Sequence, residues 1–153
     1  MGITNFIMTE KPKELMNIAF ALAKEAYNNN EVPVGAVIAR GGEVIASARN
    51  KSEELQNSCA HAEMLAIAEA CKKLGTKSLE GCDLYVTLEP CPMCAAAISF
   101  ARIARVYFGA ADPKSGGEFL FSAPQLHHKP EIYGGIGEIE CSELLQKFFR
   151  ARR

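Results

Sequence analysis

The stretch LYVTLEPCPMCAAAISFARIARVYFG, residues 84–109, decides the fold. Leu84 to Leu88 is an apolar run of strand length, and Pro90 ends it. Pro92 to Phe100 is rich in alanine and predicts a helix, after which Ile103 to Gly109 predicts a second strand. Such a strand–helix–strand unit joins parallel strands by a right-handed crossover. The stretch therefore predicts an α/β fold.

The residues before this stretch predict two helices and a hairpin. Apolar residues at helical spacing predict a helix from Pro12, in its first turn, to about Tyr27. Two short apolar runs, Val32–Ala39 and Val44–Ala48, flank a Gly-Gly pair at residues 41–42 and predict a β-hairpin. A second helix is predicted over Ala60–Lys73, with its end at Gly75.

The residues after the stretch predict a loop and a last helix. Gly, Pro and Ser residues within 110–130 are typical of a long functional loop. Glu143 to Arg150 is predicted to form the last helix. The whole pattern indicates a mixed sheet that starts with a hairpin and is covered by helices.

Length and composition indicate one globular domain over residues 1–153. The chain is 48% hydrophobic and 23% charged, which is typical of a domain with a normal core. The net charge of −1 does not suggest a strongly basic nucleic-acid-binding protein. Residues 1–99, however, carry 9 Lys/Arg and 12 Asp/Glu, whereas residues 100–153 carry 8 and 6. The four cations in residues 147–153 predict either a solvated helix end or a short arm for an anionic polymer.

The sequence also predicts a cytoplasmic location. No run approaches the roughly 20 apolar residues of a membrane span, so we expect no membrane contact. We expect no secretory signal either, because the N-terminus lacks a cationic lead and an apolar core of about 7–15 residues. In a reducing compartment, the six cysteines favour metal binding or catalysis over disulfides.

Two short motifs at the predicted starts of the central helices indicate a catalytic zinc site. Cys91 and Cys94 are three residues apart, so on a helix they share nearly one face and can bind one soft cation. His61 supplies a third ligand of the type zinc prefers. Glu63 lies about 200° from His61 on a regular helix, so both reach a metal only from the first turn. Three ligands and an open position are typical of catalytic zinc, and a carboxylate such as Glu63 can move protons of the bound water.

Other interpretations of these residues remain open at this point. Cys-x-x-Cys after a strand is also typical of thioredoxin-like redox pairs. Cys59 near His61 offers a fourth ligand for a closed, structural zinc site. His127 and His128 are adjacent in a polar loop, where surface or packing roles are more common than catalysis.

Taken together, these motifs resemble those of the bacterial tRNA-specific adenosine deaminases, which belong to the zinc nucleobase deaminases. The H-x-E and P-C-x-x-C pair is that larger group's signature. The similarity extends along nearly the whole chain, through the segments EVPVGAV (31–37), AHAE (60–63), LYVTLEPC (84–91), FGAADPKSG (108–116) and FFR (148–150). The run AAISFAR (96–102) and the His-His pair resemble alphaproteobacterial members.

The resemblance implies a cytidine deaminase-like fold, a three-layer α/β/α sandwich with a mixed five-stranded sheet. It implies one Zn2+ per subunit on His61, Cys91 and Cys94, with Glu63 as the catalytic proton shuttle. It also implies a homodimer, whereas the sequence predicts no other protein partner. The residues implied to contact substrate are Asn50 at the purine, Asp112, Lys114 and Ser115 at the anticodon backbone, and Phe149, Arg150 and Arg152 at the RNA border.

The implied reaction is hydrolytic deamination of adenosine to inosine at the wobble position (34) of a tRNA anticodon stem-loop, with the arginine tRNA of anticodon ACG as the suggested substrate. Two alternatives remain. One is a deaminase of free guanine, cytosine or cytidine on the same fold, since all these substrates need the same activated water. The other is a non-catalytic, zinc-stabilised binding module.

Overall fold

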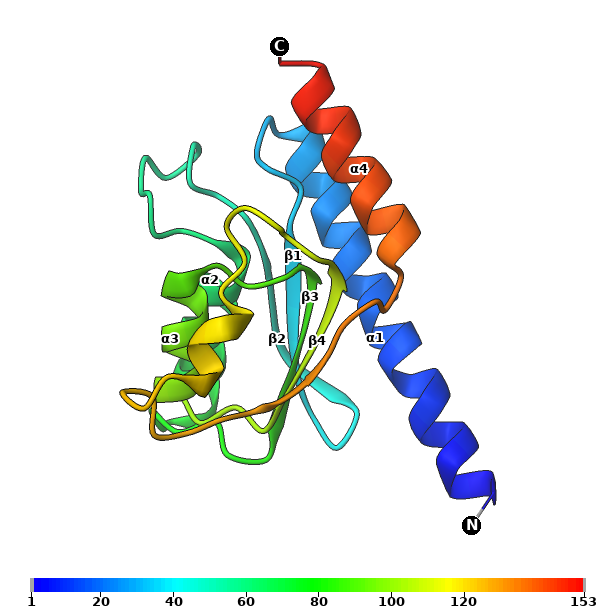
Figure 1. The fold of residues 1–153 in the computed structure, drawn as a ribbon, viewed down its shortest axis with the longest axis vertical. Coiled ribbons are helices and arrows are strands. Elements are labelled where there is room, and N and C mark those ends of the chain that lie inside the picture. The colour runs from blue at the N-terminus through cyan, green and yellow to red at the C-terminus, as the bar shows by residue number, and fades with distance from the viewer. Residues whose placement is uncertain (1, 153) are drawn as a thin grey trace.

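A mixed five-stranded sheet forms the middle of the molecule (Figure 1). The structure is a computed structural model that describes residues 2–152, with side chains described for residues 11–152. In the strand order β2-β1-β3-β4-β5, the first two pairings are antiparallel and the last two are parallel. The strands are β1 (Gly35–Arg40), β2 (Glu43–Arg49), β3 (Cys82–Leu88), β4 (Arg105–Ala110) and β5 (Glu131–Tyr133).

Helices cover both faces of this sheet. In Figure 1, α1 (Gly2–Asn28) and α4 (Glu138–Arg150) lie on one side, and α2 (Ala62–Leu74) and α3 (Pro92–Phe100) lie on the other. A short 3-10 helix, η1 (Glu118–Ser122), packs against α3. The predicted three-layer α/β/α sandwich with a mixed five-stranded sheet is therefore confirmed.

The core is divided between the two faces of the sheet. The larger cluster fills the space between the sheet and α2 and α3, where Ile38, Leu84 and Ile98 are fully buried. A smaller cluster, with Leu15 and Val37, packs α1 on the opposite face. The central strands are buried on both sides, which explains why they read as continuous apolar runs rather than as alternating ones.

The predicted hairpin and crossover form as expected. Gly41 and Gly42 have φ values of 58° and 81°, and two consecutive positive φ values suit the tight turn of a twisted hairpin. Helix α2 ends at Gly75, whose φ of 68° gives a left-handed cap. Helix α3 spans the predicted residues 92–100 and joins the parallel strands β3 and β4.

Two predicted helix starts are wrong by five residues or more, and helix α2 begins at Ala62 rather than at the predicted Ala60. Helix α1 begins at Gly2, so Pro12 lies inside it rather than in its first turn. No other proline interrupts residues 2–28, and a single proline removes one backbone donor while keeping a helical φ. Helix α4 begins at Glu138, five residues before the predicted Glu143. Its first turn carries Glu138 and Glu140, which suit the positive end of the helix dipole.

Three tyrosines stack across the parallel half of the sheet. The ring centroids of Tyr85 on β3 and Tyr107 on β4 are 4.6 Å apart, and those of Tyr107 and Tyr133 on β5 are 5.0 Å apart. This stack lies on the face that carries α1, since Tyr85 belongs to the same cluster as Leu15.

Among the described helices, none combines the length and apolarity that crossing a membrane requires.

Candidate active site

The two central helices bring the predicted zinc ligands together at their N-termini. His61 is the N-cap residue of α2, and Cys91 is the N-cap residue of α3. Cys94 follows in the first turn of α3 and is buried. Because the backbone of His61 is extended rather than helical, the 200° separation of a regular helix does not apply to His61 and Glu63. His61 and Glu63 therefore line one pocket.

The three ligand atoms have the spacing that tetrahedral zinc requires. His61 Nδ1 lies 3.6 Å from Cys91 Sγ and 3.6 Å from Cys94 Sγ, and all three atoms lie within 4.8 Å of one another. Zn–S and Zn–N bonds of about 2.3 and 2.0–2.1 Å at a tetrahedral angle give an S···N separation of about 3.6 Å. Imidazole and two thiolates form a donor set that zinc favours. The residues present thus fit a zinc ion.

The electrostatics of the cluster favour one charged thiol. Hydrogen bonds from Cys94 and His61 lower the pKa of Cys91 to about 4, and the hydrogen bond with Cys91 raises the pKa of His61. The same hydrogen bond with Cys91, together with burial, raises the pKa of Cys94. Both cysteines lie at the N-terminus of α3, where the positive end of the helix dipole favours thiolates. A divalent cation would bind this pair as thiolates.

Glu63 lies beside the ligands without belonging to the metal cluster of the described residues. Its side chain is 4% exposed in the first turn of α2. Burial raises the pKa of its carboxyl group to about 7. A carboxyl group that titrates near neutrality can both accept and donate a proton under working conditions.

A cavity of about 210 Å³ opens beside these residues. Its size suits a single flat base rather than a whole stem-loop. Three of the predicted substrate residues, Asn50, Asp112 and Ser115, line it together with His61, Glu63 and Cys91. The residues that complete the lining and that the sequence did not single out are Val32, Val34, Ser52, Ala62, Leu88 and Glu89.

The other predicted substrate residues lie outside this cavity. Lys114 is exposed on the loop after β4, and its backbone N–H donates to Asp112 Oδ1 at 3.1 Å. Phe149 and Arg150 line a separate surface cleft on α4 with Leu145 and Gln146. Arg152 packs its guanidinium over Phe148, 3.5 Å from the ring centroid.

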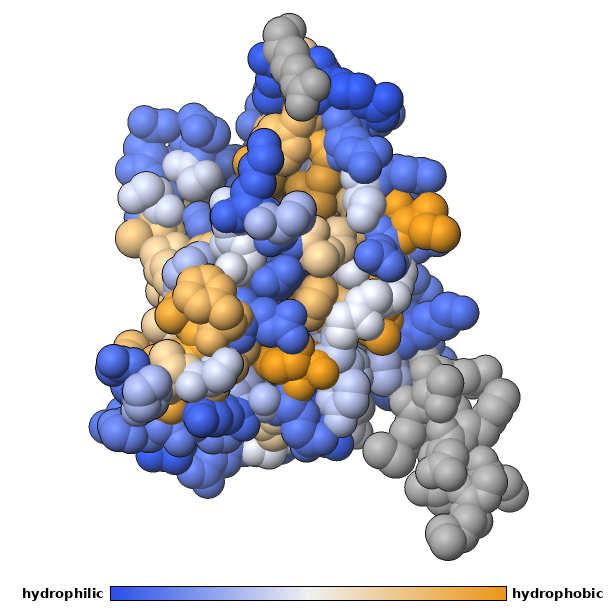
Figure 2. Space-filling view, viewed as in Figure 1, coloured by the Kyte–Doolittle hydropathy of each residue, from blue (hydrophilic) through white to orange (hydrophobic). Residues whose placement is uncertain are grey.

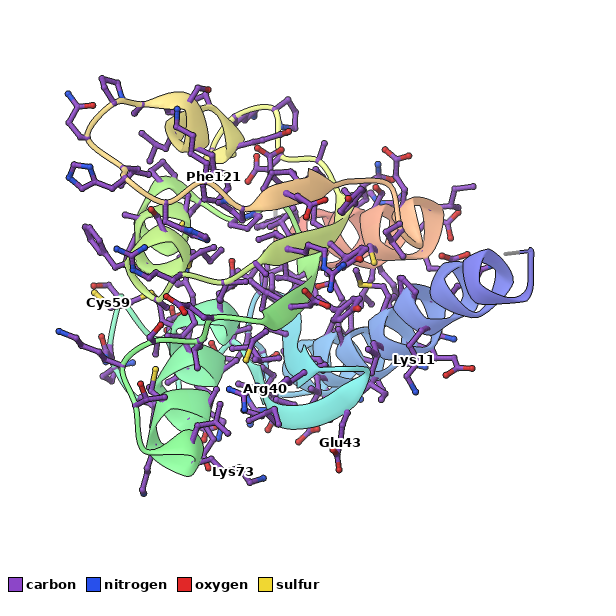
Figure 3. All side chains as sticks on the ribbon, turned by 90° about the horizontal axis from the view of Figure 1, so that it is seen from below. Lys11, Arg40, Glu43, Cys59, Lys73 and Phe121 are labelled. Carbon is purple, nitrogen blue, oxygen red and sulfur yellow. The ribbon has the colours of Figure 1, made fainter. Side chains whose placement is uncertain are left out.

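Two histidines and one cysteine considered from the sequence also lie away from the ligand cluster. His128 Nε2 lies 2.6 Å from the carbonyl oxygen of Ile103, and His127 lines a small hollow near the end of α3. Cys59 is exposed on the loop that leads to α2, and it is not among the three clustered ligands (Figure 3). These positions favour packing or surface roles for all three residues.

The chain is similar to known proteins over most of its length. The model of the cytidine and deoxycytidylate deaminase zinc-binding region matches residues 9–110. The tRNA-specific adenosine deaminase of Agrobacterium fabrum is 51% identical over 142 residues, which cover 90% of this chain and 93% of that protein.

Solved structures give the same picture. A structure from a study of A-to-I editing by tRNA:A34 deaminases at the wobble position of transfer RNA is 51% identical to this chain, with a TM-score of 0.84. The match covers 86% of this chain and 99% of the chain in that structure. The guanine deaminase of Bacillus subtilis is 32% identical with a TM-score of 0.62, covering 91% and 92%.

Proposed function

We propose that this protein converts adenosine to inosine at the wobble position of tRNA. The chain belongs to the family of the cytidine and deoxycytidylate deaminase zinc-binding region and to the tRNA-specific adenosine deaminases. The observation that carries the hydrolytic deamination is the His61, Cys91 and Cys94 cluster at the wall of a base-sized cavity, with buried Glu63 beside it. The choice of tRNA as substrate is supported by the relatives. Extrusion of a base into such a cavity is least costly from a single-stranded loop.

We propose that His61, Cys91 and Cys94 bind one zinc ion. Bound zinc lowers the pKa of a water ligand to about 7 and so makes hydroxide available at neutral pH. Glu63 takes a proton from the attacking water and delivers it to N1 of the adenine ring, while the water oxygen bonds to C6. Glu63 then takes the remaining proton of the new C6 hydroxyl group and gives it to the amino group, so that the C6–N bond breaks, ammonia leaves and the C6 carbonyl of inosine forms. The place of Glu63, buried in the wall of the pocket beside the zinc ligands, supports this double role.

We assign the remaining contacts by their place around the cavity. Asn50 lies on the wall, where its side chain suits hydrogen bonding to a purine edge. Asp112 and Ser115 lie on the opposing loop, where we expect the anticodon backbone to enter. Lys114 and the cations near the end of α4 suit phosphate groups farther along the loop. The arginine tRNA with anticodon ACG remains our proposed substrate.

The test is incubation of the zinc-loaded protein with a synthetic ACG anticodon stem-loop, followed by nucleoside analysis for inosine. We expect inosine from the RNA and none from free adenosine. A stem-loop with guanosine in place of the wobble adenosine serves as the matched control.

The rival activity is supported by the similarity to the Bacillus subtilis guanine deaminase. The metal cluster does not separate the two reactions, because both need the same activated water. Ammonia release from free guanine, with no inosine in the stem-loop, would replace the proposed function with this rival. Zinc binding without any deamination would instead favour a binding module.

We also propose a homodimer. Phe100 at the end of α3 and Phe119 on η1 are 76% and 66% exposed, and α3 and η1 pack together. Figure 2 shows hydrophobic side chains gathered over this part of the surface. Exposed apolar patches of this kind mark interaction sites. A molar mass near 33 kDa from light scattering, about twice the 16.6 kDa of one chain, would support the dimer.

A cytoplasmic location is the remaining proposal. It is supported by the six cysteines, which are all free in the structure, and by the kinship with tRNA-modifying enzymes. Cell fractionation with an antibody to the protein would test it.

A further inference from the structure

A fully buried glutamate supports the first loop of the pocket. Glu31 lies between α1 and β1 and is 0% exposed. One carboxylate oxygen accepts the backbone N–H of Glu53 at 3.0 Å, and the other accepts that of Glu54 at 2.7 Å. Both donors belong to the loop that follows β2. The carboxylate therefore fixes this loop from the interior of the protein.

This first loop carries part of the pocket wall. Asn50 at its start accepts the N–H of Ser52 at 3.2 Å through Oδ1, and its amide donates to the carbonyl of Val32 at 3.3 Å. Asn50, Ser52 and Val32 all line the cavity. The backbone N–H of Lys51 donates to Ala60, directly before the zinc ligand His61. Any shift of the loop would thus reach the wall of the pocket.

A second glutamate supports the opposing loop in the same way. Glu89 Oε1 accepts the backbone N–H of Asp112 at 3.0 Å, and Oε2 accepts that of Glu118 at 3.3 Å. The loop between these donors carries Asp112 and Ser115, which face the cavity. A Cβ atom on Gly116 would overlap the carboxylate of Glu89 and lie 2.6 Å from the backbone carbonyl oxygen of Asp112, so this close approach requires glycine.

The two glutamates occupy one end of the sheet. Glu31 precedes β1 and Glu89 follows β3, and these neighbouring strands are antiparallel. Within the described side chains, no Lys, Arg or His nitrogen lies within 4.0 Å of either carboxylate. Glu31 is fully buried and Glu89 is half-buried, and a carboxylate removed from water without a cation is costly unless hydrogen bonds stabilise it. Here the backbone N–H groups of the two pocket loops provide that stabilisation.

A carboxylate is the suitable side chain because both of its oxygens only accept hydrogen bonds. The amide of glutamine has the same shape, but its NH2 group would face one of the two N–H donors. One backbone donor would then lose its partner, and charge-assisted hydrogen bonds, which are about twice as strong as neutral ones, would become neutral. Glutamine variants therefore test the two contacts with little change in volume.

We propose that Glu31 and Glu89 are positioning residues that hold the two opposing loops of the pocket at the width of the target base, and so determine how tightly the RNA substrate binds. The RNA part of this proposal rests on the proposed function. Glu31 acts on substrate only through its loop, whereas Glu89 also lines the cavity, with both of its carboxylate oxygens bonded to the second loop.

The first test compares the Glu31→Gln and Glu89→Gln enzymes in steady-state deamination of the anticodon stem-loop. We expect KM to rise by about tenfold in each, whereas kcat stays within about threefold, because substrate binding and not the chemical step is weakened. Zinc per chain should equal that of the wild type. A matched control is Glu43→Gln, an exposed glutamate on the hairpin away from the pocket (Figure 3), which should change none of these values.

The second test needs no substrate and follows backbone amide exchange by NMR. In Glu31→Gln, the amides of Glu53 and Glu54 should exchange at least about tenfold faster. In Glu89→Gln, the same should hold for Asp112 and Glu118, and each variant should leave the other loop unchanged. Acceleration across the whole sheet would reveal general destabilisation and would overturn the proposal.

The two tests separate failure of this inference from failure of the proposed function. Unchanged exchange in both loops, or a loss of kcat with unchanged KM, would overturn the positioning role. If the wild type makes no inosine from RNA, the proposed function fails, while amide exchange still decides whether the two carboxylates hold the loops.

Discussion

At the residue scale, the ligand cluster predicts which cysteines hold the metal. Cys91→Ser and Cys94→Ser should each lower zinc per chain by at least about tenfold, because a neutral hydroxyl replaces a thiolate ligand. Inductively coupled plasma mass spectrometry on the purified variants measures this. Cys59→Ser is the matched control, since Cys59 is exposed and outside the cluster. Zinc loss in this control, with full zinc in the other two variants, would point to a different ligand set.

Substitution of Glu63 should greatly lower activity without loss of zinc, unlike substitution of the two cysteines. In Glu63→Gln, we expect zinc content to stay at the wild-type value, because the side chain is not in the ligand cluster. Inosine formation should fall by a factor of about 10²–10⁴, the usual contribution of a general acid–base group. Single-turnover assays with excess enzyme measure the loss. A variant that loses its zinc would show that Glu63 acts as a ligand instead.

The motifs in the sequence pointed to three residues that the structure brings together, but not to the residues that hold the pocket loops. Cys91, Cys94 and His61 have side chains whose metal chemistry is specific, so a short motif is informative. The spacing of His61 and Glu63 was harder to interpret, because only the structure shows that His61 precedes the helix. Glu31 and Glu89 have backbone N–H groups as partners, and any residue type supplies those. No motif therefore predicts the role proposed for these two residues.

At the element scale, the contact between α1 and β1 depends on a missing side chain. A Cβ atom on Gly35 would lie 2.0 Å from the carbonyl oxygen of Ala19 and 2.8 Å from the backbone nitrogen of Ala23. Gly35→Ala should lower the free energy of unfolding by about 2–3 kcal/mol, as overpacking typically does. Urea denaturation measures this. Gly41→Ala, with no atom within 4 Å of its Cβ but a positive φ, should cost only about 1 kcal/mol.

Element types were predictable, whereas some boundaries were not. Helix α3 was predicted over its full length because Pro92 and its alanine-rich run define both ends. The start of α4 was missed because its N-cap residue is Gly137, with a φ of 74°, and not the Ser, Thr or Asp that commonly marks a helix start. In the same helix, Phe148 is buried and Phe149 is 47% exposed, a division that depends on packing against neighbouring elements.

At the scale of the whole molecule, the near-neutral charge predicts a weak salt dependence of RNA binding. The excess of cations is confined to residues 100–153, so only a few phosphates can be neutralised. Each neutralised phosphate of a single strand contributes about −0.7 to the slope of log K for RNA binding against log salt concentration. We therefore expect a slope that is shallower than about −4. Fluorescence anisotropy with a labelled stem-loop measures it.

The contribution of α4 can be separated by one substitution. Arg150→Gln on the exposed end of the helix should reduce the magnitude of this slope by about 0.7. Lys77→Gln, an exposed cation beyond the end of α2, is the control and should leave the slope unchanged. An equal slope in all three proteins would exclude α4 from the RNA border.

The tyrosine stack gives the molecule an intrinsic optical probe. The chain has no tryptophan and four tyrosines, of which three form the stack across β3, β4 and β5. Near-ultraviolet circular dichroism and tyrosine emission will therefore report mainly on the parallel half of the sheet. Because Tyr133 on β5 forms one end of the stack, detachment of this short edge strand should change the aromatic signal before the helical signal at 222 nm decreases. Unfolding can thus be followed at two places in the protein without any added label.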